Sequence, residues 1–207
     1  MLVFYKQKLA YFAVPKTGTQ ALTGALRKHA DIAFGKRYKH MTVGKFHKGL
    51  APALESSFRL RPERFAVMRE PLDQLRSWYN FRKRDKIRNS VHSTVGISFD
   101  EFVLDVISDK PLVGRGVGSQ FNCLSTRSGK VPVHHLFAYE SQSLLLDFLE
   151  ERFETEITLQ ARNVSPKGDA ELSSEVEAKL RAARSRDFDL YARIQDAGGI
   201  LRDYTED

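Results

Sequence analysis

Short apolar runs alternate with amphipathic stretches along most of the chain. Three apolar or aromatic runs bounded by polar residues, at 9–14, 64–69 and 135–139, predict buried strands. Shorter strand patterns occur near 32–34 and at 157–161. Helical spacing and capping signals predict helices over 19–30, 42–50, 71–84, 98–108, 141–153, from Ser174 onward, and over 187–197. Residues 88–98 and 109–133 are expected to be loops or irregular structure.

Strands that alternate with helices predict an α/β fold with a central, mostly parallel sheet and helices on both faces, that is, a three-layer sandwich. The absence of internal repeats and of low-complexity linkers favours a single domain over residues 1–207. In such folds, ligands bind beyond the carboxyl ends of the strands.

The segment that joins the first strand to the first helix has the composition of an anion-binding turn. Lys16 supplies a charge, Gly18 lets the backbone approach a ligand closely, and Thr17 and Thr19 can cap the helix or bind an oxyanion. The Walker pattern differs, because its lysine directly precedes Ser or Thr after two glycines. An ordinary strand-to-helix turn with a threonine cap is the simpler alternative.

A second strand-to-helix junction carries an arginine and a serine. Arg69 follows the strand at 64–69, Pro71 fits the first turn of a helix, and Ser77 lies about 9 Å along that helix. The planar guanidinium of arginine suits bidentate binding of phosphate, so both side chains can converge on one phosphate group. A surface arginine beside a capped helix is the alternative reading.

Together, the two junctions resemble the family of sulfotransferases that use 3′-phosphoadenylyl sulfate (PAPS), in particular its carbohydrate-type branch. The resemblance rests on the segment 15–19 and on Arg69, Pro71, Ser77 and Tyr79. It implies a P-loop-like turn in which Lys16, Thr17, Gly18, Thr19 and Gln20 bind the 5′-phosphosulfate. It also implies that Arg69 and Ser77 bind the 3′-phosphate. Weaker similarities to the family occur at 39–42, 136–140, 163–165 and 187–191.

The resemblance implies a sulfotransferase that moves a sulfuryl group from PAPS to a hydroxyl or amine of a carbohydrate, lipid or small molecule by in-line displacement. Lys16 then stabilises charge on the departing phosphate oxygen. A hydroxyl acceptor needs a general base, for which His40 is the first candidate. His47, expected on the same helix face, and the strand-end residues Glu70 and Glu140 are the alternatives.

No metal-ligand pattern is evident, and sulfuryl transfer does not require a metal. A P-loop-type nucleotide kinase or hydrolase is one alternative function, although the chain lacks the Walker lysine that this class needs. A catalytically silent, anion-binding relative is the other.

Charge is distributed unevenly, with a net charge of +14 over residues 1–139 and −7 over residues 140–207. Basic clusters lie at 27–48 and 82–88, and basic fields attract anionic ligands. The acceptor, a small molecule or glycan, can therefore be anionic. A nucleic-acid partner is not expected, since helix-turn-helix, zinc and RNA-recognition signatures are absent.

One cysteine and the lack of a long apolar run place the chain among proteins without disulfides or a membrane span. Cys123 has no second cysteine with which to pair, and a small core residue is its simplest interpretation. No signal peptide is evident. A reducing, bacterial cytoplasm is therefore the expected location.

Overall fold

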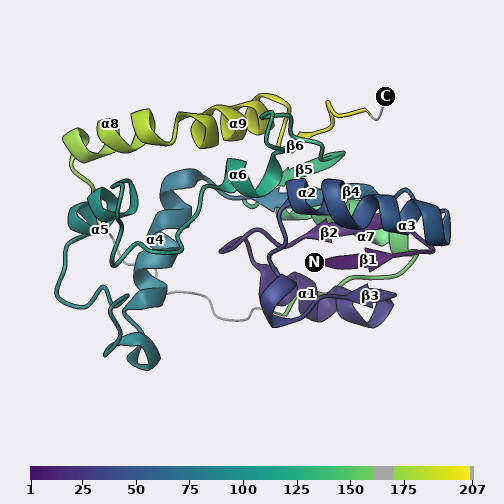
Figure 1. The fold of residues 1–207 in the computed structure, drawn as a ribbon, viewed down its shortest axis with the longest axis horizontal. Helices are drawn as coiled ribbons and strands as arrows, with labels where there is room; N and C mark the ends of the chain where they lie inside the picture. The colour runs from purple at the N-terminus through teal and green to yellow at the C-terminus, as the bar shows by residue number, and fades with distance from the viewer. Residues whose placement is uncertain (161–169, 206–207) are drawn as a thin grey trace.

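The computed structural model describes residues 1–160 and 170–205 of the chain. Within these residues, six strands form one mixed sheet in the order β3-β1-β2-β4-β5-β6 (Figure 1). The strands are β1 (Leu2–Phe4), β2 (Leu9–Phe12), β3 (Ile32–Ala33), β4 (Glu63–Met68), β5 (His135–Ala138) and β6 (Ile200–Leu201). The four strands predicted at 9–14, 32–34, 64–69 and 135–139 are confirmed, and the α/β class with them.

The prediction of a mostly parallel sheet is wrong at both edges. β2 and β5 each run parallel to β4, but β1 pairs antiparallel with β2 and β3, and β6 pairs antiparallel with β5. Strands β1 and β6 were not predicted, because strands this short show no clear alternation of polar and apolar positions. The turn between β1 and β2, residues 5–8, is too short for a parallel crossover, so this pair must be antiparallel.

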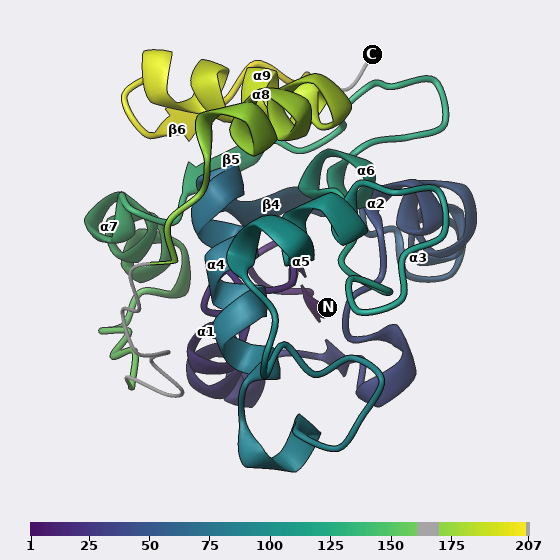
Figure 2. The same cartoon turned by 90° about the vertical axis from the view of Figure 1, so that its left-hand side faces the viewer.

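Helices cover both faces of the sheet. The helices within the described residues are α1 (Thr19–Leu26), α2 (Val43–Lys45), α3 (Ala51–Phe58), α4 (Pro71–Arg82), α5 (Phe99–Val106), α6 (Gln120–Leu124), α7 (Gln142–Phe153), α8 (Ser174–Ala183) and α9 (Ser185–Asp196). Figure 2 shows α1 and α7 on one side of the strands and α2 and α3 on the other.

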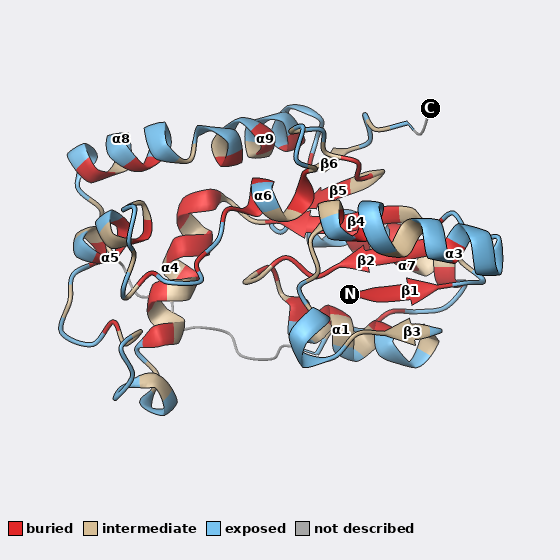
Figure 3. Ribbon diagram, in the orientation of Figure 1, coloured by how far each residue is buried: buried red, intermediate tan, exposed pale blue. Residues whose placement is uncertain are grey.

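The alternation of side chains along each strand explains this arrangement. Phe12 and Met68 belong to a core that also contains side chains of α2, α3, α6 and α9. Their chain neighbours Tyr11 and Val67 point to the opposite face, where they join a core with α1 and α7. The central strands are buried on both faces, which accounts for their uninterrupted apolar sequence (Figure 3).

A third core joins α4, α5 and α8 at the end of the molecule away from α3 (Figure 1). Leu75 and Tyr79 of α4 pack there with Phe102 of α5 and Leu180 of α8. Another face of α4 contacts the turn that follows β2. Among the described helices, none combines the length and the apolar composition that crossing a membrane requires.

Several helix boundaries differ from the predictions. The capping box at Ser98 and Glu101 is confirmed, but Ser173 rather than Ser174 caps α8. The helix expected over 42–50 consists of α2 and a π-helical turn, Phe46–Leu50, and it continues into α3. α6 lies in the segment 109–133, which was expected to be irregular.

Two further expectations concern the region after α7. Residues 157–160 form no strand, so the strand expected at 157–161 is wrong over the part that the structure describes. The family-like segment 163–165 lies outside the described residues.

Candidate functional site

Three neighbouring parallel strands end at the same edge of the sheet and bring the sequence-predicted segments together. β2 leads into the turn at 13–18, β4 leads into Arg69, and β5 leads into Tyr139. The pairing continues one step past β5, where the Tyr139 N–H donates to the Met68 carbonyl at 2.8 Å. Residues distant in the sequence therefore meet at this edge, as expected for a ligand site in an α/β fold.

The turn after β2 is tightly folded. Lys16 and Gly18 both have a φ of 70°, in the left-handed region, and this conformation is unusual for a lysine. The Thr17 hydroxyl donates to the Val14 carbonyl at 2.9 Å, so this buried side chain holds the turn internally. Gly18, and neither threonine, is the N-cap of α1, which has no side-chain cap. The alternative of a threonine cap is therefore not borne out.

The remaining turn residues lie at the start of α1. Thr19 is the first residue of the helix and is buried, whereas the Gln20 side chain is exposed. A Cβ added at Gly18 would lie 3.2 Å from the Tyr139 ring, closer than nearly all such contacts. Glycine is thus favoured at this position both by its φ angle and by the approach of the aromatic ring.

Lys16 extends along α4 and places its ammonium group against two aromatic rings. Its Nζ lies 4.1 Å from the centroid of the Phe81 ring and 5.3 Å from that of Trp78, as in cation–π contacts. Burial at this position is the main cause that lowers the pKa of Lys16 from its ordinary 10.5 to about 8.

Three arginines add to this lowering of the Lys16 pKa, in the order Arg84, Arg69, Arg82. Arg82 is buried, and its Nη2 donates to the Arg115 carbonyl at 2.8 Å, so this arginine of the basic cluster at 82–88 is packed into the protein. Neighbouring positive charges repel one another, and a bound anion stabilises them because it relieves this repulsion. The electrostatics of this edge therefore suit a highly charged anionic ligand.

Arg69 is held at the end of β4 by its backbone and by an aromatic ring. Its guanidinium carbon lies 4.8 Å from the centroid of the Tyr139 ring. Its backbone N–H donates to Gln120 Oε1 at 3.0 Å, and its carbonyl accepts from Gln120 Nε2 at 2.8 Å. Among the described residues, its buried Nε has no hydrogen-bond partner. An acceptor oxygen from a ligand would satisfy this donor.

Ser77 lies on the face of α4 that contacts the turn. Gln74, three residues earlier, donates from Nε2 to the Pro15 carbonyl at 3.1 Å, and Phe81, four residues later, contacts Lys16. Positions spaced by three and four residues share one helix face, so the buried Ser77 lies between these two contacts. The structure thus places the two predicted phosphate motifs side by side.

A hydrogen bond joins His40 to the end of the strand that precedes the turn. Its Nδ1 lies 2.6 Å from the Ala13 carbonyl, and since a carbonyl can only accept, Nδ1 carries the hydrogen. Nε2 of the neutral ring therefore keeps a lone pair, as a general base requires. Partial desolvation, together with the nearby charges of Lys39 and the N-terminal ammonium, lowers the pKa of His40, although the Ala13 hydrogen bond opposes this shift.

The other base candidates are placed less favourably. Both side chains are exposed, but His47 lies on the π-helical turn and His40 lies before α2, so the expectation that both share one helix face is wrong. Glu70 is the N-cap of α4, and its Oε2 accepts from the Asp73 N–H at 2.7 Å. Burial raises the Glu70 pKa.

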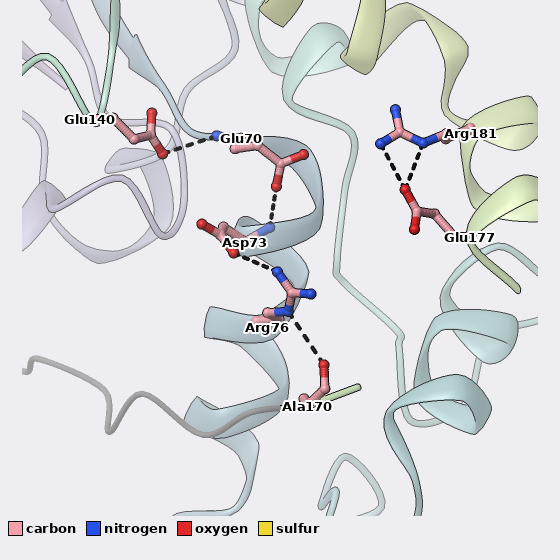
Figure 4. A network of polar contacts seen from close by, with 7 residues as sticks. All are labelled: Glu70, Asp73, Arg76, Glu140, Ala170, Glu177 and Arg181. Atoms are coloured by element: carbon pink, nitrogen blue, oxygen red, sulfur yellow. Dashed lines mark hydrogen bonds and ion pairs between the residues drawn. The ribbon is translucent and has the colours of Figure 1, made fainter. Parts of the chain in front are cut away.

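The carboxylate of Glu140 also has structural partners. Oε1 accepts from the Glu70 N–H at 3.3 Å, and Oε2 accepts from the Tyr191 hydroxyl at 2.7 Å. Figure 4 shows Glu140 and Glu70 in a chain of contacts that continues through Asp73 to Arg76. Both glutamates thus connect strand ends to helices, which leaves His40 as the better placed base.

Several residues at this edge were not predicted as site residues. Gln74, Trp78 and Phe81 lie inside the second motif, and their spacing with Ser77 along one helix face was a usable signal. Gln120 had no such signal, because its helix has only five residues and lies within a segment rich in glycine. Tyr139 was noted only as part of a family-like strand end.

The contact between Lys16 and Trp78 predicts an optical titration. Trp78 is the only tryptophan, and deprotonation of Lys16 removes the cation beside its ring. We expect Trp78 fluorescence to change with an inflection near pH 8, and Lys16→Met to abolish that transition. Lys83→Met is the control, because Lys83 lies over Tyr79 instead. An inflection near 10.5, or one that persists in Lys16→Met, would contradict this placement of Lys16.

Comparison with known proteins assigns no family to this chain. No protein-family model matches it, and no curated protein matches it significantly. Among the described residues, no group of three or more His, Cys, Asp or Glu side chains is arranged to hold a metal ion. The function must therefore be argued from this edge of the sheet, which carries a half-buried lysine, neighbouring arginines and a histidine bonded through Nδ1 to the strand end.

Proposed function

We propose that this protein is a sulfotransferase that transfers the sulfuryl group of PAPS to a hydroxyl or amine acceptor. One observation carries the proposal: the turn that holds Lys16 and the guanidinium of Arg69 follow neighbouring parallel strands, and both lie against the Tyr139 ring. PAPS carries anionic groups at both its 5′ and its 3′ positions. Two motifs that supply cations from adjacent strand ends suit such a ligand.

The residues present fit this donor. The turn at 15–19 and Gln20 would bind the 5′-phosphosulfate, with Lys16 as its cation and the N-terminus of α1 beside it. Arg69 and Ser77 would bind the 3′-phosphate, and the unsatisfied Nε of Arg69 supports this role. The proposal also includes a three-layer α/β sandwich with a P-loop-like turn. We place the reaction in a bacterial cytoplasm, as the single cysteine favours.

The proposed reaction is an in-line displacement at sulfur. The acceptor oxygen forms a bond to the sulfur while the bond from sulfur to the 5′-phosphate oxygen breaks, and 3′,5′-ADP leaves. His40 Nε2 takes the proton of the acceptor hydroxyl. Lys16 stabilises the negative charge that develops on the departing phosphate oxygen. Both groups contact or belong to the segment that follows β2, so one short stretch of backbone positions them.

The acceptor is a carbohydrate, lipid or small molecule, and charge favours an anionic one. The segment 32–54, which contains His40, includes Lys36, Arg37, Lys39, Lys45 and Lys48 but no Asp or Glu. Most of these cations are exposed. A purely basic surface around the base attracts an anionic acceptor and raises its association rate. No metal is assigned a role.

The donor proposal predicts a strong preference for ligands with a 3′-phosphate. In calorimetry, 3′,5′-ADP should bind more tightly than AMP or ATP, because AMP and ATP leave Arg69 without its phosphate. Arg69→Ala should remove most of this preference, about tenfold or more, and Ser77→Ala should have a smaller effect. Arg181→Ala, in an ion pair on α8, is the matched control. Equal affinities for AMP and 3′,5′-ADP would contradict the proposal and favour a nucleotide kinase, a hydrolase or a silent relative.

Lys16 should affect the rate of transfer more than it affects product binding. Its charge is needed most when the leaving oxygen becomes anionic, so Lys16→Ala should slow transfer by roughly 100-fold or more at saturating donor. The measurement is turnover of labelled PAPS, with Lys83→Ala as the control. Near-normal turnover of Lys16→Ala would show that Lys16 is a neighbour of the site and not part of its chemistry.

The proposed base predicts the pH dependence of transfer. His40 acts as a base when it is neutral, and its lowered pKa means that the rate should rise with pH through a value below 6.5. In kcat/KM, which reports the pKa values of the free enzyme, the rate should fall again near pH 8 as Lys16 loses its proton. His40→Ala should abolish transfer and leave 3′,5′-ADP affinity nearly unchanged, with His47→Ala as the control. If the rate of His40→Ala still rises in full with pH on the acid side of the profile, the base is His47 or Glu70 and not His40.

A further inference from the structure

Two buried glutamines hold the backbones of the two anion-binding motifs. Of the glutamines that the structure describes, only Gln74 and Gln120 are buried, with 4% and 1% of their surfaces exposed. We propose that they are positioning residues with separate tasks: Gln120 sets the preference for the 3′-phosphate through Arg69, and Gln74 holds the turn that binds the 5′ group. This inference rests on the proposed function, since it assigns each glutamine to one end of PAPS.

Gln120 completes the hydrogen bonding of β4 at the point where the sheet ends. The β2 ladder reaches Ala66 and the β5 ladder reaches Met68, so Arg69 lies beyond both. The amide of Gln120 accepts from the Arg69 N–H and donates to the Arg69 carbonyl. One side chain therefore binds both polar groups of this residue, as a neighbouring strand would. The backbone from which the guanidinium extends is fixed in direction.

The position of Gln120 is itself fixed by the start of α6. Ser119 is the N-cap of α6, and its hydroxyl accepts from the Asn122 N–H at 3.1 Å. The Phe121 N–H donates to the Asp187 carboxylate of α9 at 2.9 Å, and Phe121 packs in a main core. Because α6 is anchored from two sides, the amide of Gln120 is a rigid reference for Arg69. The guanidinium then rests on the Tyr139 ring with its Nε unsatisfied.

Gln74 makes a different contact at the other motif. Its Nε2 donates to the Pro15 carbonyl, the residue immediately before Lys16. This bond attaches the turn to α4 and keeps Lys16 alongside Trp78 and Phe81. Among the described residues, the side-chain amide of Gln74 makes no hydrogen bond to Arg69, and that of Gln120 makes none to the turn. The two contacts can therefore be removed one at a time.

The separation of tasks leads to a ratio test with two probes, AMP and 3′,5′-ADP. Both carry a 5′-phosphate, and only 3′,5′-ADP carries a 3′-phosphate. Gln120→Met keeps a side chain of similar length without hydrogen-bonding groups. It should reduce the ratio of the AMP Kd to the 3′,5′-ADP Kd about tenfold, the size of a lost charge-assisted contact, while AMP binding stays unchanged. Gln74→Met, the matched control, should weaken both ligands by the same factor and leave the ratio unchanged.

A role in stability alone would not alter this ratio. A destabilised protein contains fewer active molecules, and calorimetry reports that loss as a lower stoichiometry, not as a change in relative affinity. If Gln120→Met does not fold, Gln120→Asn carries the same test. It keeps both amide groups but retracts them by one methylene from Arg69, so the ratio should again fall.

The outcomes separate the two proposals. A wild-type ratio near one would overturn the donor assignment, and the inference about the glutamines with it. A wild-type preference for 3′,5′-ADP that is unchanged in the Gln120 variants would overturn the inference alone and leave the proposed function in place. A ratio that falls equally in Gln74→Met and Gln120→Met would show that the two motifs are one coupled unit, which also contradicts the separate tasks.

Discussion

The parallel pairing of β2, β4 and β5 determines where the residues of the candidate site lie. Parallel neighbours end at the same edge of a sheet, so the segments after Phe12, Met68 and Ala138 must meet there. Without the register between β2 and β4, Lys16 and Arg69 would not interact. The antiparallel edge strands extend the sheet but contribute none of these residues. The site thus depends on the half of the sheet that is parallel.

The fold brings cations together at this edge against their mutual repulsion. Aromatic rings offset part of that cost, since Lys16 lies over Phe81 and Arg69 lies over Tyr139. Burial and, after it, the neighbouring arginines lower the Lys16 pKa, so the positive charge is still disfavoured at this position. A protein under selection for stability alone would place a carboxylate here, whereas Glu70 and Glu140 at the same strand ends are bound to backbone and to Tyr191. The remaining electrostatic strain is what an anionic ligand would relieve.

The sequence predicted the central strands and both strand-to-helix junctions because these features are local. A buried strand is a continuous apolar run, and a strand-to-helix turn is a few adjacent residues. Strands β1 and β6 were not predicted, because two or three residues are too few to show an alternation of polar and apolar positions. These two strands change the sheet from mostly parallel to mixed. Gln120 escaped because its importance comes from a contact across 51 positions of sequence. The alternative of a threonine cap does not hold, because Gly18 is the N-cap and Thr17 uses its hydroxyl within the turn.

The two sides of the proposed reaction are built differently. The donor side depends on buried contacts to backbone, such as those of Gln74 and Gln120, and a change in any of them disturbs the packing around it. The acceptor side is a basic segment whose cations are mostly exposed, and His40 is bonded there to the Ala13 carbonyl at the end of the strand. Exposed charges can be exchanged at little cost in stability. If the proposed reaction holds, its donor specificity is fixed by the fold, whereas its acceptor specificity can change by substitutions on the surface around His40.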